Sequence, residues 1–430
     1  MTPATPGKGP KAVLVAAAGA DWEAQALEHL AAGAPDVVLA RRCVDLAELL
    51  ATAGVGLASV ALVSVTLPGL DADSVSVLRG AGVGVVVVSA PHELLDGDAE
   101  RMRRLGVDHL LVSTELGSLL ETVAAEGAEP SRASGSTGSR PAAPWLEGPE
   151  ASPPGRVLAV WGPTGAPGRT TVAVGLAAEV ADLGRDVLLV DADPYGGTVG
   201  QHLGVLDEAS GLLGAARAAN AGQADRLAGF ARQVGPCLRV LTGLPRPDRW
   251  AEVRPTAFAD VVEEAARVEA LVVVDVGFSL EGDPVDPFGS SAPQRNQMTL
   301  AALERADEVL VVGAADPVGL ARLARGLVEL REVVPGLRPR VVVNRTRPSL
   351  GWSDREIQGM VEGFVTPLGV HFLPDDRAAA DRALMAGKSL PECGESPLRT
   401  AMTALARAVL GEPVAPRAGR LRRRRAGRAR

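Results

Sequence analysis

Residues 162–171, GPTGAPGRTT, combine three glycines with a cation and three hydroxyl side chains in one short segment. An apolar strand is predicted before this segment at 157–161, and a helix after it from Thr170. The backbone N–H groups of such a loop and the positive end of the helix dipole point at one spot, which favours a phosphate group. The residues expected to contact phosphate are Gly165, Ala166, Pro167, Gly168, Arg169, Thr170 and Thr171.

Three aspartates follow aliphatic runs further along the chain. Asp191 and Asp193 come after DVLLV, and Asp275 closes LVVVD. The carboxyl ends of parallel strands meet at one edge of a sheet, so these side chains are expected in the same crevice as the loop. Hydroxyl and carboxylate oxygens suit Mg²⁺, which predicts Thr170 and Asp275 as metal ligands, the aspartate through water. Asp193 is expected to orient an attacking water, with Asp191 beside it as the second catalytic candidate.

The loop fills the frame GxxxxGK[ST] of a Walker A motif, but with substitutions. Pro163 stands at the place of the first glycine, and Arg169 at the place of the phosphate-binding lysine. Pro167 also removes one backbone donor. The chain has no lysine between Lys11 and Lys388, so no other register supplies one. A strand-turn-helix corner rich in glycine and proline, without a ligand, is the competing interpretation of the loop alone.

In its context the loop resembles that of the MinD/ParA class of P-loop ATPases. VDADPYGG resembles the DxDP signature of the class, and the resemblance extends over residues 156–410. VVVNRTRP, with Asn344 and Arg345, is similar to the base-recognition strand, and the ending with Pro374 and Gly387 is similar to the class's last motif. The resemblance implies ATP and Mg²⁺ as cofactors, a base bound near Asn344 and Pro374, and a nucleotide-dependent homodimer.

The N-terminal part alternates aliphatic strands with helices, which is typical of a parallel sheet covered on both faces. Strands are expected at 12–18, 36–42, 60–65, 83–90 and 108–114, and helices at 22–32, 45–53, 98–105 and 116–125. The order of these elements, the LPGLD after the third strand and the LGVDHLLV around the fifth resemble a response-regulator receiver domain.

The receiver family requires an acidic pair, a phosphate-accepting aspartate and a lysine at strand ends. This chain has alanines at 16–18, Ser64 and Ser113 at those places, and Ser89 after the fourth strand. Without carboxylates there is no Mg²⁺ site and no acyl-phosphate, so the segment is expected to be a pseudo-receiver that binds partners. A generic flavodoxin-like domain is the alternative.

The expected fold class is therefore α/β, with two parallel-sheet domains. The first is receiver-like (flavodoxin-like) and the second is a P-loop NTPase domain. Residues 126–155 are rich in Pro, Gly, Ser and Glu and are expected to form a flexible linker. The predicted organisation is a disordered N-terminus at 1–10, the pseudo-receiver at 11–125, the linker at 126–155, the ATPase domain at 156–412 and an Arg-rich disordered tail at 413–430.

A receiver-like domain before a MinD/ParA-like domain with a deviant Walker A is most similar to the CpaE/TadZ proteins of tad-type pilus assembly systems. Related actinobacterial CpaE-like proteins are labelled septum-site-determining. The class carries a signature lysine that reaches across the dimer, and here Thr164 stands in its place. The proline usually found two residues after the Walker B aspartate is Gly277. These departures predict nucleotide binding with weak or no hydrolysis.

The charge of the chain is asymmetric. The net charge is −8, and residues 417–430 contain eight arginines and no acid, so removing the +8 of the tail leaves −16 on the rest. Such a tail is expected to meet an anionic partner, which could be membrane headgroups, nonspecific DNA or an acidic protein. A disordered solubilising tail is the plainer alternative.

The polar N-terminus, without an apolar core segment, and three scattered cysteines predict a cytoplasmic protein. A peripheral location at the inner membrane face is compatible with the tail.

Three function classes follow from these observations. The first is a nucleotide-binding spatial organiser for pilus, secretion or division machinery. The second is a ParA-like partition ATPase that uses nonspecific DNA as its matrix. The third is an enzyme on the same fold, but an autokinase needs a tyrosine cluster and Tyr195 is the single tyrosine, and an iron protein needs cluster cysteines that this chain does not supply.

Overall fold

The computed structural model describes most of the chain, in ten ranges. They are residues 11–32, 37–56, 58–92, 102–103, 105–107, 109–126, 155–165, 168–206, 209–282 and 294–413. The predicted N-terminal extension at 1–10, nearly all of the predicted linker and the Arg-rich segment 417–430 lie outside these ranges. Ala166 and Pro167 of the predicted phosphate loop also lie outside them.

The first sheet has five parallel strands in the order β2-β1-β3-β4-β5. This is the flavodoxin-like order. All five strands predicted for this part of the chain are present. They are β1 (Lys11–Ala16), β2 (Val37–Arg42), β3 (Val60–Ser64), β4 (Gly84–Ser89) and β5 (His109–Val112).

Helices cover both faces of this sheet, because alternate residues of its strands are buried on opposite sides. On one face lie α2 (Leu46–Gly54) and α3 (Ala72–Gly80), and on the other α1 (Glu23–Ala31) and α5 (Leu119–Glu126), which follows the 3₁₀ turn η1 (Ser113–Ser118). Aspartates begin two of these helices: Asp45 accepts a hydrogen bond from the Glu48 N–H, and Asp71 forms a capping box with Ser74. Of the helix expected near 98–105, only Met102 and Arg103 are described as helical.

The second sheet has eight strands in the order β13-β12-β11-β6-β10-β7-β9-β8. All neighbours run parallel except the edge pair β8 and β9, which is antiparallel. These two short strands have no counterpart in the sequence-based prediction. The strands are β6 (Arg156–Trp161), β7 (Val187–Ala192), β8 (Arg232–Gly235), β9 (Leu238–Leu241), β10 (Leu271–Val276), β11 (Glu308–Ala314), β12 (Arg340–Thr346) and β13 (Gly369–Pro374).

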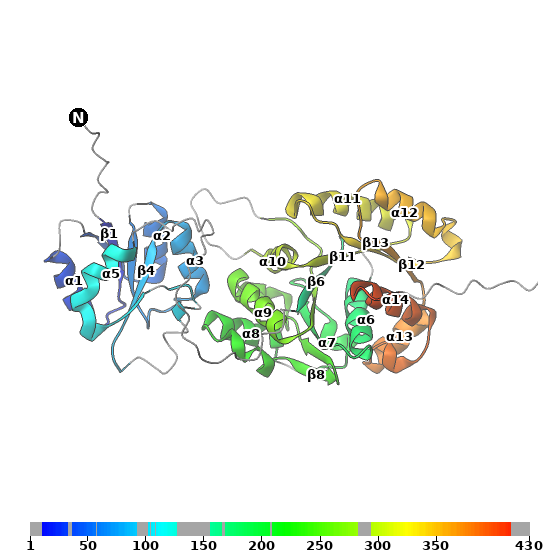
Figure 1. Cartoon of the computed structure of the whole chain (residues 1–430), viewed down its shortest axis with the longest axis horizontal. Helices are drawn as coiled ribbons and strands as arrows, with labels where there is room; N and C mark the ends of the chain where they lie inside the picture. Colours follow the sequence, from blue (N-terminus) through cyan, green and yellow to red (C-terminus); the bar gives the residue numbers. More distant parts are fainter. Residues whose placement is uncertain are drawn as a thin grey trace, which may run out of the picture.

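Two helical layers enclose the second sheet (Figure 1). One contains α6 (Arg169–Asp182), α7 (Val199–His202), α13 (Arg377–Ala386) and α14 (Pro397–Val409). The other contains α8 (Gly211–Asn220), α9 (Pro255–Val268), α10 (Gln297–Arg305), α11 (Pro317–Val333) and α12 (Asp354–Glu362). Short 3₁₀ turns connect some of these elements: η2 (Ala224–Gly229), η3 (Pro247–Glu252), η4 (Pro348–Leu350) and η5 (Pro391–Cys393). The predicted α/β class is confirmed.

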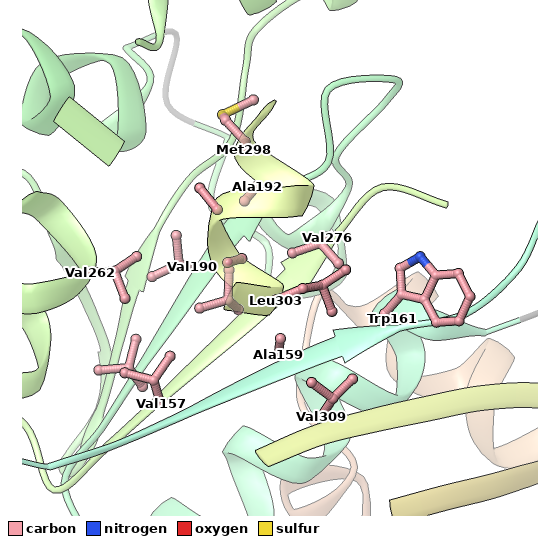
Figure 2. Packing of buried hydrophobic residues seen from close by; sticks show 14 of the residues in the cluster. Val157, Ala159, Trp161, Val190, Ala192, Val262, Val276, Met298, Leu303 and Val309 are labelled. Carbon is pink, nitrogen blue, oxygen red and sulfur yellow. The ribbon is translucent and has the colours of Figure 1, made fainter. Parts of the chain in front are cut away.

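The core of this sheet is almost entirely aliphatic. β10 is buried along its whole length, which explains its continuous LVVVDV sequence. Figure 2 shows the face beneath α10, where Val157, Ala159 and Trp161 of β6 and Val190 of β7 meet Met298 and Leu303. Trp161 is the one large aromatic residue among them, and its indole N–H donates a 3.2 Å hydrogen bond to the Phe278 carbonyl. This bond ties the end of β6 to the segment that follows β10.

The two sheet units contact each other through α3 and α9. The Thr256 hydroxyl donates a short hydrogen bond to Asp73 Oδ1, and Arg254 Nε lies 3.7 Å from Asp73 Oδ2. Burial raises the pKa of the Asp73 carboxyl. A charged group of one unit is therefore held by a hydroxyl and a guanidinium of the other.

Within the described part of the chain, no helix combines the length and the apolar character needed to cross a bilayer.

Candidate nucleotide-binding site

The described part of the loop between β6 and α6 contains two glycines with positive φ. Gly165 has φ +66° and Gly168 has φ +96°, and Gly168 directly precedes the first residue of α6. Such positive φ values favour glycine. A Cβ at Gly168 would also lie 2.5 Å from Asn344 Nδ2, so the space at this position admits only glycine. The two glycines predicted from the motif are thus required by the loop geometry.

Thr170 and Asp275, the predicted metal ligands, are in contact. Thr170 Oγ1 donates a 2.6 Å hydrogen bond to Asp275 Oδ2. Asp275 Oδ1 is buried and has no hydrogen-bond partner among the described residues. Burial, and secondarily the charge of Asp191, raise the pKa of Asp275 to about 8. A buried carboxylate oxygen without a partner is costly, and a cation with its water shell would satisfy it.

These two side chains fit a magnesium ion that is bound together with phosphate. Mg²⁺ in phosphate sites is commonly held by one or two protein oxygens, with waters and phosphate oxygens completing its shell. The described residues include no group of three or more His, Cys, Asp or Glu side chains able to hold a metal alone. A cation here would therefore need the nucleotide as a further ligand.

Asp191 lies deeper in the site and is held by the backbone. Its carboxylate accepts hydrogen bonds from the N–H of Val199 at 3.1 Å and of Asp193 at 3.4 Å. Two glycines surround it: a Cβ at Gly197 would lie 2.0 Å from Asp191 Oδ1, and a Cβ at Gly243 would lie 2.6 Å from its Cγ. Burial raises the pKa of Asp191 to about 7. This environment suits a residue that shapes the loop after β7.

Asp193 faces the loop cation. Its Oδ2 lies 3.7 Å from Arg169 Nη2, and its Oδ1 accepts a 2.9 Å hydrogen bond from the Tyr195 N–H. Arg169 Nη1 donates to the Gly162 carbonyl at 3.2 Å, and its guanidinium lies 5.9 Å from the centre of the Phe278 ring. Arg169 is therefore directed toward Asp193 and the base of the loop.

An aromatic pair supports this side of the site. The rings of Tyr195 and Phe278 lie 4.7 Å apart, and the Tyr195 hydroxyl donates a 2.7 Å hydrogen bond to Asn296 Oδ1. A Cβ at Gly277 would approach Pro194 Cδ to 2.9 Å. Gly277, which stands where the class that this chain resembles has proline, thus leaves room for Pro194.

A second group of predicted residues lines a cavity of about 400 Å³ beside the loop. This volume is in the range of small-molecule sites. Asn344 lies at its inner end, where its side-chain oxygen accepts a 2.9 Å hydrogen bond from the N–H of Arg345, which has φ +59°. The cavity is lined by Gly168, Thr171, Asn344 and Pro374, all predicted from sequence, and also by Arg345, Asp375, Asp376, Arg377, Asp381 and Met402.

The described site residues predicted from sequence therefore lie around the loop and its adjoining cavity. Gly197, Gly243 and Phe278 were not predicted. Gly197, within VDADPYGG, offered a signal, but its contact with Asp191 depends on the path of the chain after β7. Gly243 and Phe278 belong to no motif.

The sequence matches no protein-family model and no curated protein. Its structural neighbours are MinD/ParA family P-loop ATPases. A ParA family ATPase from Chlorobium tepidum has 19% identity and a TM-score of 0.47, with 58% of this chain and 98% of that chain covered. The cell division ATPase MinD from Pyrococcus furiosus has 20% identity and a TM-score of 0.48, covering 60% and 99%. The septum site-determining protein MinD complexed with Mg-ADP, from Pyrococcus horikoshii, has 18% identity and a TM-score of 0.47, covering 59% and 95%.

Proposed function

We propose that this chain binds ATP or ADP with Mg²⁺ and uses the bound state to organise other proteins in space. One observation carries the proposal: Asp275, with one oxygen on Thr170 and the other buried without a described partner, lies at the foot of a loop with two positive-φ glycines. Phosphates would lie over residues 165–171, and the base in the cavity of Asn344 and Pro374.

In this proposal each residue has a distinct part. Thr170 and Asp275 hold the magnesium ion, which neutralises phosphate charge when bound. Asp193 orients the attacking water, and Arg169 lies 3.7 Å from its carboxylate. Asp191 positions Asp193 through the backbone hydrogen bond between them.

Hydrolysis is proposed to be slow or absent. Efficient phosphoryl transfer needs cations that neutralise the developing charge. Arg169 shares its charge with Asp193, Pro163 and Pro167 alter the loop sequence, and Thr164 replaces the class's signature lysine.

We further propose a CpaE/TadZ-like role in the cytoplasm, as a homodimer that places pilus, secretion or septum-site machinery. The N-terminal unit would act as a pseudo-receiver: at the place of the phosphate-accepting aspartate, Ser64 Oγ lies 2.9 Å from Thr66 Oγ1, and after the fourth strand Ser89 Oγ donates to the Ala90 carbonyl. Hydroxyls in these places favour a binding module that is not phosphorylated. Residues 417–430 would bring the chain to an anionic membrane surface; attachment to nonspecific DNA by a partition ATPase is the alternative.

Isothermal titration calorimetry with ATP and ADP at millimolar concentration tests the nucleotide proposal. We expect binding that strengthens with Mg²⁺ in the intact chain, and loss of that strengthening in Asp275→Asn. The absence of both heat and thermal shift in the intact chain would overturn the site.

A localisation experiment tests the organiser role. Fluorescently tagged protein should form discrete foci at poles or septa. Decoration of the whole nucleoid that follows the ATP state would instead support the partition ATPase.

A further inference from the structure

The side chain of Arg322, on α11, lies against Gly165 of the phosphate loop. The position of a Cβ at Gly165 is 2.0 Å from Arg322 Nη1 and 3.0 Å from its Cζ. Because the guanidinium ends a flexible side chain, this distance shows proximity and not a rigid contact. The cation therefore lies directly beside the loop in the same chain.

The packing of α11 fixes the face that carries Arg322. Gly326, one turn further along the helix, packs on the loop: a Cβ there would lie 3.0 Å from Pro163 Cβ and from Trp161 Cη2. Residues four apart share one face of a helix. The proline that departs from the Walker A pattern thus forms part of the surface that holds α11, and Arg322, at the loop.

Arg322 has no ion-pair partner among the described residues. It lines a cavity of about 350 Å³ together with Pro163 and Thr164 on the loop side. Glu281, Glu329 and Glu332 line the same cavity, but no ion pair joins any of them to Arg322 in the described part of the chain. Arg325 is a second cation on its wall.

The loop's own cation is directed elsewhere. Arg169 donates to the Gly162 carbonyl and has Asp193 at 3.7 Å, so part of its charge is compensated within the protein. Polyphosphates bring several negative charges, and arginine binds phosphate oxygens through its planar fork. The site therefore has, beside Gly165, a cation that forms no ion pair with the described residues, and at the helix start a cation that is partly compensated by Asp193.

We propose that Arg322 is a phosphate-binding residue of this site and supplies, from α11 of the same chain, the cation that the loop lacks at Thr164. The inference rests on the proposed nucleotide binding and adds to it a ligand outside the loop. The guanidinium would bind the nucleotide phosphates from the α11 side of the loop, opposite the cavity of Asn344 and Pro374.

The test compares Arg322→Ala with Arg325→Ala in the full chain, by calorimetry with Mg·ATP. Arg325 is the matched control because it lies on the same helix and the same cavity wall. We expect Arg322→Ala to weaken ATP binding at least tenfold, as for loss of a charge-assisted hydrogen bond, and Arg325→Ala to change it less than threefold. Arg322→Lys should retain part of the affinity, and both alanine variants should keep the thermal unfolding midpoint of the intact chain.

Different results would overturn different conclusions. If the intact chain binds ATP and Arg322→Ala binds it equally well, the role of Arg322 is wrong and the nucleotide site stands. If the intact chain does not bind ATP, the proposed function fails and this inference fails with it. A loss in Arg322→Ala that appears only at protein concentrations where dimers form would place Arg322 at an interface between copies, contrary to the proposal.

Discussion

Thr170 Oγ1 and Asp275 Oδ2 are joined by a 2.6 Å hydrogen bond that links the first turn of α6 to the last residues of β10. The helix α6 follows β6, and β6 and β10 are parallel neighbours in the sheet. The start of α6 and the end of β10 therefore lie at the same edge of the sheet. Among the described residues, the hydroxyl is thus the one hydrogen-bond partner of a carboxyl group whose second oxygen is buried. We expect both the stability of the protein and the proposed cation binding to depend on this bond.

Thr170→Val should destabilise the protein and remove the Mg²⁺ dependence of nucleotide binding. The valine keeps the shape but leaves Asp275 buried without a hydroxyl, which costs about 1–3 kcal/mol of unfolding free energy. Urea unfolding and a magnesium titration measure the two effects. Thr170→Ser retains the hydroxyl and should behave like the intact chain; equal loss in both variants would contradict a role for the hydroxyl.

The pH dependence of stability should reveal the raised pKa of Asp275. Its ordinary value is 3.8, and burial raises it to about 8 in the folded chain. Between these values the folded protein keeps a proton that the unfolded chain releases. The stabilisation that this proton provides is therefore complete below about pH 4 and is lost as the pH rises through 8. The free energy of unfolding falls by up to about 1.4 kcal/mol per pH unit.

Asp275→Asn should flatten this pH dependence in urea unfolding without nucleotide between pH 5 and 8. Asp191, with a pKa of about 7, remains in the variant and keeps a smaller slope of the same sign. Identical slopes for the intact chain and the variant would show that Asp275 is ionised throughout.

Gly197→Ala should destabilise the protein, whereas Gly196→Ala should not. A Cβ at Gly197 would lie 2.0 Å from Asp191 Oδ1, but one at Gly196 has no neighbour within 4 Å. Neither glycine has a positive φ, so the pair isolates the effect of space. We expect a loss of about 1–3 kcal/mol at 197 and less than about 0.5 kcal/mol at 196, measured by chemical unfolding. Comparable losses in the two variants would mean that the Asp191 side chain can move away from a Cβ at position 197.

Steady-state ATP turnover of the purified chain should stay below about 1 s⁻¹, the lower end of ordinary enzyme rates. The reason is that Arg169 shares its charge with Asp193, 3.7 Å away, and that Pro163, Thr164 and Pro167 depart from the Walker A pattern. Asp193→Ala serves as the control and should abolish any residual hydrolysis. Faster turnover that disappears in Asp193→Ala would contradict the prediction.

Deleting residues 417–430 should abolish salt-sensitive binding to anionic vesicles or duplex DNA. The remainder of the chain carries −16 and would be repelled by such surfaces. At physiological salt the Debye length is about 8 Å, so the tail acts locally. Co-sedimentation at several salt concentrations measures the effect, with replacement of the eight arginines by glutamine as a length-matched control. Unchanged binding after deletion would assign attachment to another part of the chain.

Much of this architecture was predictable from the sequence, because parallel strands covered on both faces need unbroken aliphatic runs such as LVVVDV. The meeting of Thr170 with Asp275 was predictable for a related reason: carboxyl ends of parallel strands share one edge. The strand β8 was missed because RQVG has little aliphatic character, and β9 was missed because LRVL is only four residues long.

The contacts of Arg322 with Gly165 and of Gly326 with Pro163 were beyond the sequence pattern. They depend on β11 pairing beside β6 and on the rotation of α11 over the loop, which side-chain packing decides. Periodicity shows which face of α11 is apolar but not which residue of that face meets the loop. For the same reason the sequence did not indicate that Asp191 lies between Gly197 and Gly243.

The contact of Asp73 with Arg254 and Thr256 is favoured because the two sheet units are covalently connected. Both sheet units belong to one polypeptide, and covalent connection raises the local concentration of one unit around the other. An association too weak to detect between separate fragments can therefore be populated in the intact chain. If the bond between α3 and α9 opens, the two units stay connected through the chain and the same contact can form again.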